Sequence, residues 1–187
     1  MCRLTMILEH PIYSTAIAII SGMIYSKLTS RDHSWIVIAS AYTPDVDVVA
    51  DFLLRKIGIV VLINGNPIKH GDFHNMAALL IYAVLVALLL HPLGIRLVDS
   101  FIFASIGFAA HLVEDALVFN QGYAFFWPLS SQKYGIGIIG YHKDLYGIAD
   151  RYVLCIGLVA VVVCAAIRTA CEGKGWVKTF LHRTQPA

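Results

Sequence analysis

Long apolar runs alternate with short polar segments along this chain, and this pattern predicts membrane-spanning helices. The first run extends from about Ile12 to Leu28, and the later long runs cover Met76 to Leu90, about Leu97 to Val118, and Tyr152 to about Ile167. A helix of about 20 predominantly apolar residues crosses a bilayer. We therefore expect a polytopic helical protein whose polar segments lie at the membrane surfaces.

Two further apolar runs are too short to cross a bilayer. Ser34 to Thr43 ends at Pro44, which blocks a helix-interior hydrogen bond, and ten helical residues extend only about 15 Å against a hydrocarbon core of about 30 Å. Ile57 to Ile63 ends at a turn signal, Asn64–Pro67. The first is predicted to be an incomplete span, and the second an interfacial or re-entrant segment.

Composition supports the same class. Hydrophobic residues make up 58% of the chain and charged residues 14%, with a mean hydropathy of +0.73, whereas soluble domains are about 25% charged. We predict an all-α membrane protein of about four or five transmembrane or partly spanning helices. Residues 1–187 would form a single domain with a final span over 152–167 and a basic tail over 168–187. A net charge of +2 gives no reason to expect nucleic-acid binding.

The cysteines and the N-terminus carry little functional signal. Cys2, Cys155, Cys164 and Cys171 form no C-x-x-C pair, so we interpret them as small packing residues. Glu9 and His10 precede the first apolar run and no small-residue cleavage site is present, so a removable signal peptide is not expected.

Histidines and carboxylates at the ends of the apolar runs are the main candidates for chemistry. An ionisable group at bilayer depth costs at least about 2.5 kcal/mol, so such residues usually mark a functional site. If five runs cross, the alternating directions bring all of the candidates to one membrane face. This convergence is lost if the run before Pro44 does not cross. The candidate metal ligands are His10, Asp45, Asp47, His70, His74, His111 and Asp115.

Residue type and spacing favour metal binding. His111 and Asp115 are spaced i, i+4, which places both side chains on one helix face, and His70 and His74 have the same spacing. Imidazole with carboxylate suits zinc, manganese or iron, and the lack of cysteine ligands argues against a closed structural zinc site. We expect two or three divalent ions per chain, most simply zinc.

Each candidate also has a structural interpretation. His111 can be hydrogen-bonded to a neighbouring helix, and Asp45 and Asp47 can cap a helix and favour its dipole. His70 and His74 can form the polar start of an interfacial helix. His142 is either a loop residue or an extra ligand or proton carrier. The remaining histidines, which we interpret as interfacial, are His33, His91 and His182.

The order of these candidates, followed by Phe126-Trp127-Pro128-Leu129, resembles the YdjM-like family of membrane-bound metal-dependent hydrolases over about residues 8–150. The stretch from His111 to Leu129 is the most specific part. The family is also distantly similar to zinc-dependent phospholipase C and P1-type nucleases. The resemblance implies that the following residues are metal ligands or their close partners: His10, Asp45, Asp47, His74, His111 and Asp115.

The chain departs from the family pattern at two places. A His-Arg-Gly-x-Thr-His-Ser pattern is expected where this chain has Lys69-His70-Gly71-Asp72-Phe73-His74-Asn75, so His70 stands where an arginine is expected. Val118 replaces a threonine that usually follows the His-x-x-x-Asp-x-Leu stretch. The role of His70 is therefore left open.

Together these observations predict a membrane phosphoesterase, similar to a phospholipase C or a lipid phosphatase, that acts on a lipid or lipid-linked substrate through metal-activated water. Asp45 or Asp47 would bridge metals or take the proton of the water. Lys69, Arg55 and Arg151 would meet the charge on the phosphoryl oxygens. Amide or ester hydrolysis stays open.

The loop over residues 120–150 contains Gly135, Gly137 and Gly140, which suit a mobile lid or, as we slightly favour, ordinary turns. The rival function is a divalent-cation or proton transporter that uses the same His/Asp cluster. Against it, the sequence shows no second cluster at the opposite face. A scaffold stabilised by metal is a third hypothesis. Basic residues in short segments favour a cell-membrane protein with a cytoplasmic C-terminal tail and a site facing away from the cytoplasm.

Overall fold

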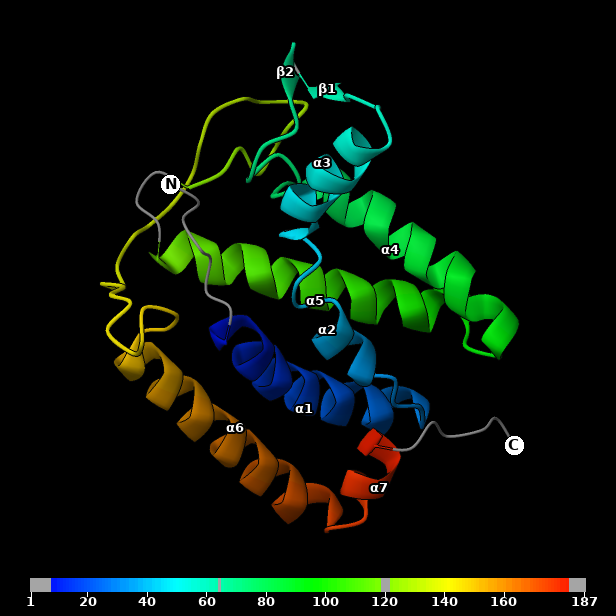
Figure 1. Ribbon diagram of the computed structural model, residues 1–187. Helices are drawn as coiled ribbons and strands as arrows, with labels where there is room; N and C mark the ends of the chain where they lie inside the picture. The colour runs from blue at the N-terminus through cyan, green and yellow to red at the C-terminus, as the bar shows by residue number, and fades with distance from the viewer. Residues whose placement is uncertain (1–7, 64, 119–121, 182–187) are drawn as a thin grey trace.

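The computed structural model describes residues 8–63, 65–118 and 122–181, and helices dominate this part of the chain (Figure 1). The four long helices are α1 (Glu9–Thr29), α4 (Met76–Leu90), α5 (Leu97–Val118) and α6 (Arg151–Glu172). The shorter elements are α2 (Trp35–Ala39), α3 (Val46–Lys56), β1 (Leu62–Ile63), β2 (Asn66–Pro67), the 3-10 helix η1 (His91–Leu93) and α7 (Trp176–Leu181). The protein is therefore an all-α membrane-type bundle, as predicted.

Three of the described segments are long and apolar enough to cross a membrane: Met76–Leu93, Leu97–Val118 and Arg151–Glu172. The bounds of α4 and α5 agree with the predicted spans. The helix of the last predicted span, α6, ends at Glu172, not near Ile167, so Arg168 belongs to a helix and not to a basic tail. α1 is the fourth long helix, and it packs against α6 and α5.

Glycines allow the helices to approach one another closely. A Cβ at Gly157 of α6 would lie 2.9 Å from Cγ2 of Ile12, so α6 packs directly on the start of α1. A Cβ at Gly107 of α5 would lie 2.5 Å from the carbonyl oxygen of Val37, so α2 packs directly on α5. These two contacts bring α1, α2, α5 and α6 together.

The segment predicted as an incomplete span is a short helix followed by turns. α2 covers only Trp35–Ala39, and Ile36, Val37 and Ala41 are buried where α2 packs between α1 and α5. Irregular backbone at membrane depth is tolerated where protein shields it from lipid. The shielded turns after α2 carry Asp45 and Asp47 to the end of the bundle where α4 begins. The candidate ligands therefore converge although no complete helix crosses before Pro44.

A second group of buried charges lies at the opposite end of the bundle. Arg168 of α6 is buried, and its guanidinium donates to Asp32 Oδ2 at 2.6 Å and to Glu172 Oε2 at 2.9 Å. Arg31 donates to Asp99 Oδ2 at 2.6 Å, and the Asp99 carboxylate also accepts from Tyr25. Most of these charges are distant in sequence and meet only through helix packing, so the sequence did not predict this group; it consists of ion pairs, and the described residues form no second metal-ligating group there.

Candidate metal centre

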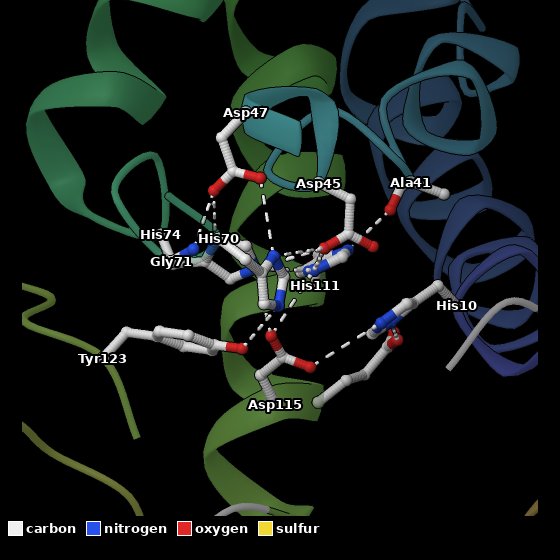
Figure 2. Close-up of polar contacts among 11 residues, drawn as sticks. His10, Ala41, Asp45, Asp47, His70, Gly71, His74, His111, Asp115 and Tyr123 are labelled. Carbon is white, nitrogen blue, oxygen red and sulfur yellow. Dashed lines mark hydrogen bonds and ion pairs between the residues drawn. The ribbon is translucent and has the colours of Figure 1, made fainter. Parts of the chain in front are cut away.

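All seven candidate ligands gather at the end of the bundle where α1 and α4 begin and α5 ends (Figure 2). His10 lies in the first turn of α1, and His111 and Asp115 lie in the last two turns of α5. Asp45 and Asp47 are at the start of α3, and His70 and His74 lie in the segment before α4. Four segments that are distant in sequence thus contribute to one cluster.

Four of the ligand atoms enclose a small space. Nε2 of His74 lies 3.2 Å from Asp115 Oδ2, 3.4 Å from Asp45 Oδ1 and 3.3 Å from His111 Nε2. His111 Nε2 lies 3.5 Å from Asp115 Oδ2 and 3.7 Å from Asp45 Oδ1. Four ligands about 2.0 to 2.1 Å from a tetrahedral zinc ion would be separated by about 3.3 to 3.4 Å. The spacing of these atoms therefore fits a shared metal ion.

The remaining ligands extend this group in two directions. His10 Nε2 lies 3.6 Å from Asp115 Oδ1, and the ligand atoms of His10, His111 and Asp115 lie within 4.8 Å of one another. The ligand atoms of Asp45, His70 and His74 form a second group within the same limit. Two separate triads thus lie side by side, joined by the short distances from His74 and Asp45 to His111 and Asp115, which suits more than one ion.

Several of these buried atoms lack a hydrogen-bond partner among the described residues: His10 Nε2, His74 Nδ1, Asp45 Oδ1 and both carboxylate oxygens of Asp115. Buried polar atoms are normally satisfied, and unsatisfied ones often mark an ion. Because these atoms belong to imidazoles and carboxylates, the set matches the donors that zinc, manganese and iron accept. The residues of the cluster therefore fit a divalent metal.

Neighbouring acceptors fix the orientation of two histidine rings. His10 Nδ1 donates to Glu114 Oε2 at 2.6 Å, and His111 Nδ1 donates to the carbonyl oxygen of Ala41 at 2.7 Å. In both residues Nε2 is then left as the electron-pair donor toward the cluster. The two rings stack with centroids 3.7 Å apart. Such second contacts orient metal-ligating histidines and raise their basicity.

Asp47 and His70 form the outer side of the cluster. The Gly71 backbone N–H donates to Asp47 Oδ2 at 2.7 Å, and His70 Nδ1 lies 3.4 Å from Asp47 Oδ1. The Tyr123 hydroxyl contacts His70 Nε2 at 3.0 Å. Gly71 has φ +99°, and a Cβ there would lie 2.7 Å from the Tyr123 ring, so glycine is required in this turn. His70 is 27% exposed at its side chain, more than any other of the seven candidate ligands.

Mutual ion pairing shifts the titration of the groups outside the spans. Burial alone disfavours the charged form of His74, but contacts with Asp115, Asp45 and Asp47 outweigh it and raise the pKa of His74 to about 10. Burial likewise opposes ionisation of Asp45 and Asp47. Contacts with His74 in both cases, and with His70 and the Gly71 N–H for Asp47, nevertheless hold both carboxyl pKa values below their ordinary value. The carboxylates are therefore ionised and ready to bind a cation.

The predicted substrate-binding cations are not part of the cluster. Arg55 pairs with Asp51 and Arg151 pairs with Asp144, each at 2.9 Å and each exposed. Lys69 is exposed beside His70. His142 is exposed, and its backbone N–H donates to Asp150 rather than its ring to the cluster.

In its described part, the loop predicted as a lid or a set of turns is hydrogen-bonded to the end of α5 and to Glu9 of α1. The backbone N–H groups of Ile136 and Ile139 donate to the carbonyl oxygens of Ala116 and Leu117 at the end of α5. The Tyr141 hydroxyl and the Asp150 N–H donate to Oε1 of the buried Glu9. Gly137 has φ +60°, which suits a turn. Residues 119–121 of this loop lie outside the described part.

Sequence reasoning missed several contributors to the centre. Glu114 stood beside Asp115 in the most informative stretch but received no role. The Ala41 carbonyl and the Gly71 N–H are backbone groups, and the type of a residue does not predict a contact made by its backbone. Tyr123 is one of several aromatic residues in the loop after α5, and its sequence context does not distinguish it from the others. The three described cysteines, Cys155, Cys164 and Cys171, are free and lie in α6, away from the cluster.

A bundle with three candidate membrane spans and a buried His/Asp cluster defines a helical membrane protein with a candidate metal centre. A family model described as YdjM inner membrane protein matches residues 6–176. The chain belongs to this family, in agreement with the resemblance found in the sequence. No curated protein and no solved structure matches the chain.

Proposed function

We propose that the chain is a membrane-embedded, metal-dependent hydrolase that cleaves a phosphoester of a lipid or lipid-linked substrate. The observation that carries the proposal is the group formed by His74, His111, Asp45 and Asp115, in which the two imidazole Nε2 atoms lie 3.2 to 3.7 Å from each other and from an oxygen of each carboxylate. Unsatisfied carboxylates and imidazoles at this depth cost stability, so the stability of the helices does not account for this arrangement. A catalytic metal is the simplest reason for their presence.

Divalent metal ions in such a site supply an activated water and neutralise charge on phosphoryl oxygens. The protein's own groups would orient the histidine rings and exchange protons. The Glu114 carboxylate and the Ala41 carbonyl orient His10 and His111. Asp47 holds the ring of His70 at 3.4 Å, and the Tyr123 hydroxyl contacts the other nitrogen of this ring at 3.0 Å. His70 is thus the group of the cluster best placed to exchange a proton with a substrate that enters from outside.

The position of the cluster favours a substrate at the membrane surface. Met76, at the start of the apolar helix α4, directly follows the turn that holds His74 and Asn75, and Asp115 lies in the last turn of α5. The ends of spanning helices lie near the headgroup layer. A lipid phosphate in that layer would reach the cluster without leaving the membrane.

A transporter of divalent cations or protons is the second candidate, and the buried charges around Arg168 and Asp99 at the opposite end favour it more than the sequence did. Those charges, however, are paired with one another at 2.6 Å, and although His33 Nε2 lies 3.7 Å from Asp99 Oδ2, the described residues there form no group of three or more metal-ligating side chains. We therefore place the hydrolase first.

Turnover in detergent separates these functions, because no gradient exists there. Zinc- or manganese-loaded protein would be incubated with phosphatidic acid, phosphatidylglycerol and a polyprenyl phosphate, and the release of phosphate or headgroup would be measured before and after chelation. We expect chelation and Asp115→Asn each to abolish release, whereas Asp144→Asn, at an exposed pair, would leave it unchanged. Ion uptake into vesicles without turnover would establish the transporter. A metal-dependent melting temperature with neither activity would establish the scaffold.

A further inference from the structure

The helix that carries Asp47 into the cluster has an opposite face that the protein leaves uncovered. Asp47, Asp51 and Arg55 are spaced i, i+4, i+8 and share one face of α3. Val46, Val49 and Leu53 share another, and they are 45%, 53% and 54% exposed. Of the α3 side chains with described burial, only Asp47 is buried. α3 is therefore amphipathic, but its apolar face has no described protein partner.

The chain that follows α3 continues this exposed apolar surface. Ile57, Ile59, Val60 and Leu62 are between 48% and 69% exposed, up to the β1–β2 hairpin. Figure 1 shows α3 running across the direction of α4, near the end at which α4 begins, and not alongside the long helices. α4 itself presents exposed apolar side chains such as Leu80 and Val84 to the surroundings. Both α3 and α4 thus leave apolar side chains uncovered by the described protein.

Charge at the end of α3 complements a lipid headgroup layer. Arg55 and Lys56 form its last turn, and the Lys56 ammonium lies 4.9 Å from the Phe52 ring centroid. Lys69 is exposed beside the cluster. An amphipathic helix with basic residues at its polar edge and aromatic or aliphatic residues opposite lies in the plane of a membrane interface. Long basic side chains extend from such a position to the lipid phosphates.

We propose that α3 and the segment 57–62 insert in the plane of one membrane leaflet, with the apolar face of α3 among the acyl chains and Arg55, Lys56 and Lys69 at the lipid phosphates. Asp47 projects from the opposite face of the same helix, so this insertion fixes the metal centre at headgroup depth. The statement that a lipid phosphate is presented to the metal centre rests on the proposed function. The position of α3 in the membrane does not depend on that function, because it is inferred from the exposed apolar face of the helix.

Depth measured by spin labelling tests this seating without any turnover assay. A nitroxide would be attached at Leu53→Cys or Val49→Cys on the apolar face, and at Arg55→Cys on the polar face as the matched control. All labels would be placed in a background in which the four native cysteines are replaced, in vesicles of phosphatidylcholine and phosphatidylglycerol. Leu85→Cys in α4 and Tyr146→Cys, which is 92% exposed in the loop, would serve as lipid and water references.

Collision of the label with oxygen, which concentrates in lipid, and with chromium oxalate, which stays in water, reports the depth. We expect Leu53 and Val49 labels to show the oxygen-rich, chromium-poor pattern of Leu85, and the Arg55 label to lie toward the pattern of Tyr146. Water-like patterns at Leu53 and Val49 would overturn the inference. Loss of both collisions, with spin–spin broadening, would show that a second copy of the chain covers the face, which would also overturn it. Lipid-like depth in a protein without hydrolase activity would remove the proposed function and leave the seating intact.

Discussion

A substitution of Glu114 tests how the protein orients its candidate metal ligands, because it changes none of the predicted ligands themselves. The His10 Nδ1 atom donates to Glu114 Oε2 at 2.6 Å, with both side chains almost completely buried. This contact directs His10 Nε2 toward Asp115 Oδ1, 3.6 Å away, and the ring stacks on His111. Glu114→Gln retains a side-chain carbonyl oxygen that can accept from His10 Nδ1 but replaces the carboxyl group that orients the ring.

The expected effect follows from the role of such contacts. Changing an outer partner of a metal-ligating histidine typically costs 10- to 100-fold in metal affinity, which is about 1.4 to 2.8 kcal/mol. Because the contact is short and buried, we expect Glu114→Gln to lie in the upper part of that range. Glu114→Ala should cost more, since it also leaves His10 Nδ1 without an acceptor, at about 1 to 3 kcal/mol.

The assay is a competitive zinc titration of metal-depleted protein in detergent against a chelator of known affinity. Asp144→Asn is the matched control, because it neutralises a carboxylate in an exposed pair with Arg151 away from the cluster. Circular dichroism of each metal-free variant would establish that the helices are intact. Unchanged zinc affinity in folded Glu114→Gln would refute the reasoning that Glu114 orients a ligand.

Three further outcomes are expected. Asp32→Asn should destabilise the protein by about 1.5 to 3 kcal/mol because it removes the shorter of the two charged contacts of the buried Arg168 and leaves only the pair with Glu172, whereas Asp51→Asn at an exposed pair should cost about 0 to 1 kcal/mol; equal melting temperatures in detergent would contradict this. The pKa of His74 is raised to about 10 in the metal-free protein, so zinc must displace its proton. Affinity should therefore fall about tenfold per pH unit as the pH is lowered from about 10 to 7, and calorimetry in buffers of different ionisation enthalpy should detect the released proton. Gly71→Ala should weaken zinc binding, since a Cβ would meet the Tyr123 ring and displace the N–H that holds Asp47, while Gly147→Ala, with φ +73° and open space, should add backbone strain alone.

The elements that could be predicted from the sequence are those whose signals are local. α4 and α5 were predicted with their observed bounds because each apolar run is delimited by polar or helix-breaking residues, such as Asn75 before α4 and His91-Pro92 after it. The cluster of seven ligands was predicted because ionisable residues are rare in apolar runs, and the structure brings all seven together.

The remainder depends on packing between distant segments. The segment before Pro44 was predicted to be too short to span, but its sequence does not distinguish an apolar surface that faces lipid from one that is covered by α1 and α5. The end of α2 at Ala39 and its burial between these helices were therefore not foreseen. Arg168 was assigned to a basic tail because nothing near it in sequence shows that Asp32 lies 2.6 Å away. Its i, i+4 spacing from Glu172 was the available signal.

The metal content of the purified protein tests the central claim most directly. Elemental analysis would be performed on detergent-solubilised wild-type protein, Asp115→Asn and the control Asp144→Asn after equilibration with zinc, manganese or iron and removal of free metal. The account predicts about two ions per chain in the wild type and the control, from the two adjacent triads, and a reduced content in Asp115→Asn, whose wild-type carboxylate lies 3.2 Å from His74 and 3.5 Å from His111. Wild-type protein that binds none of these metals would contradict the account.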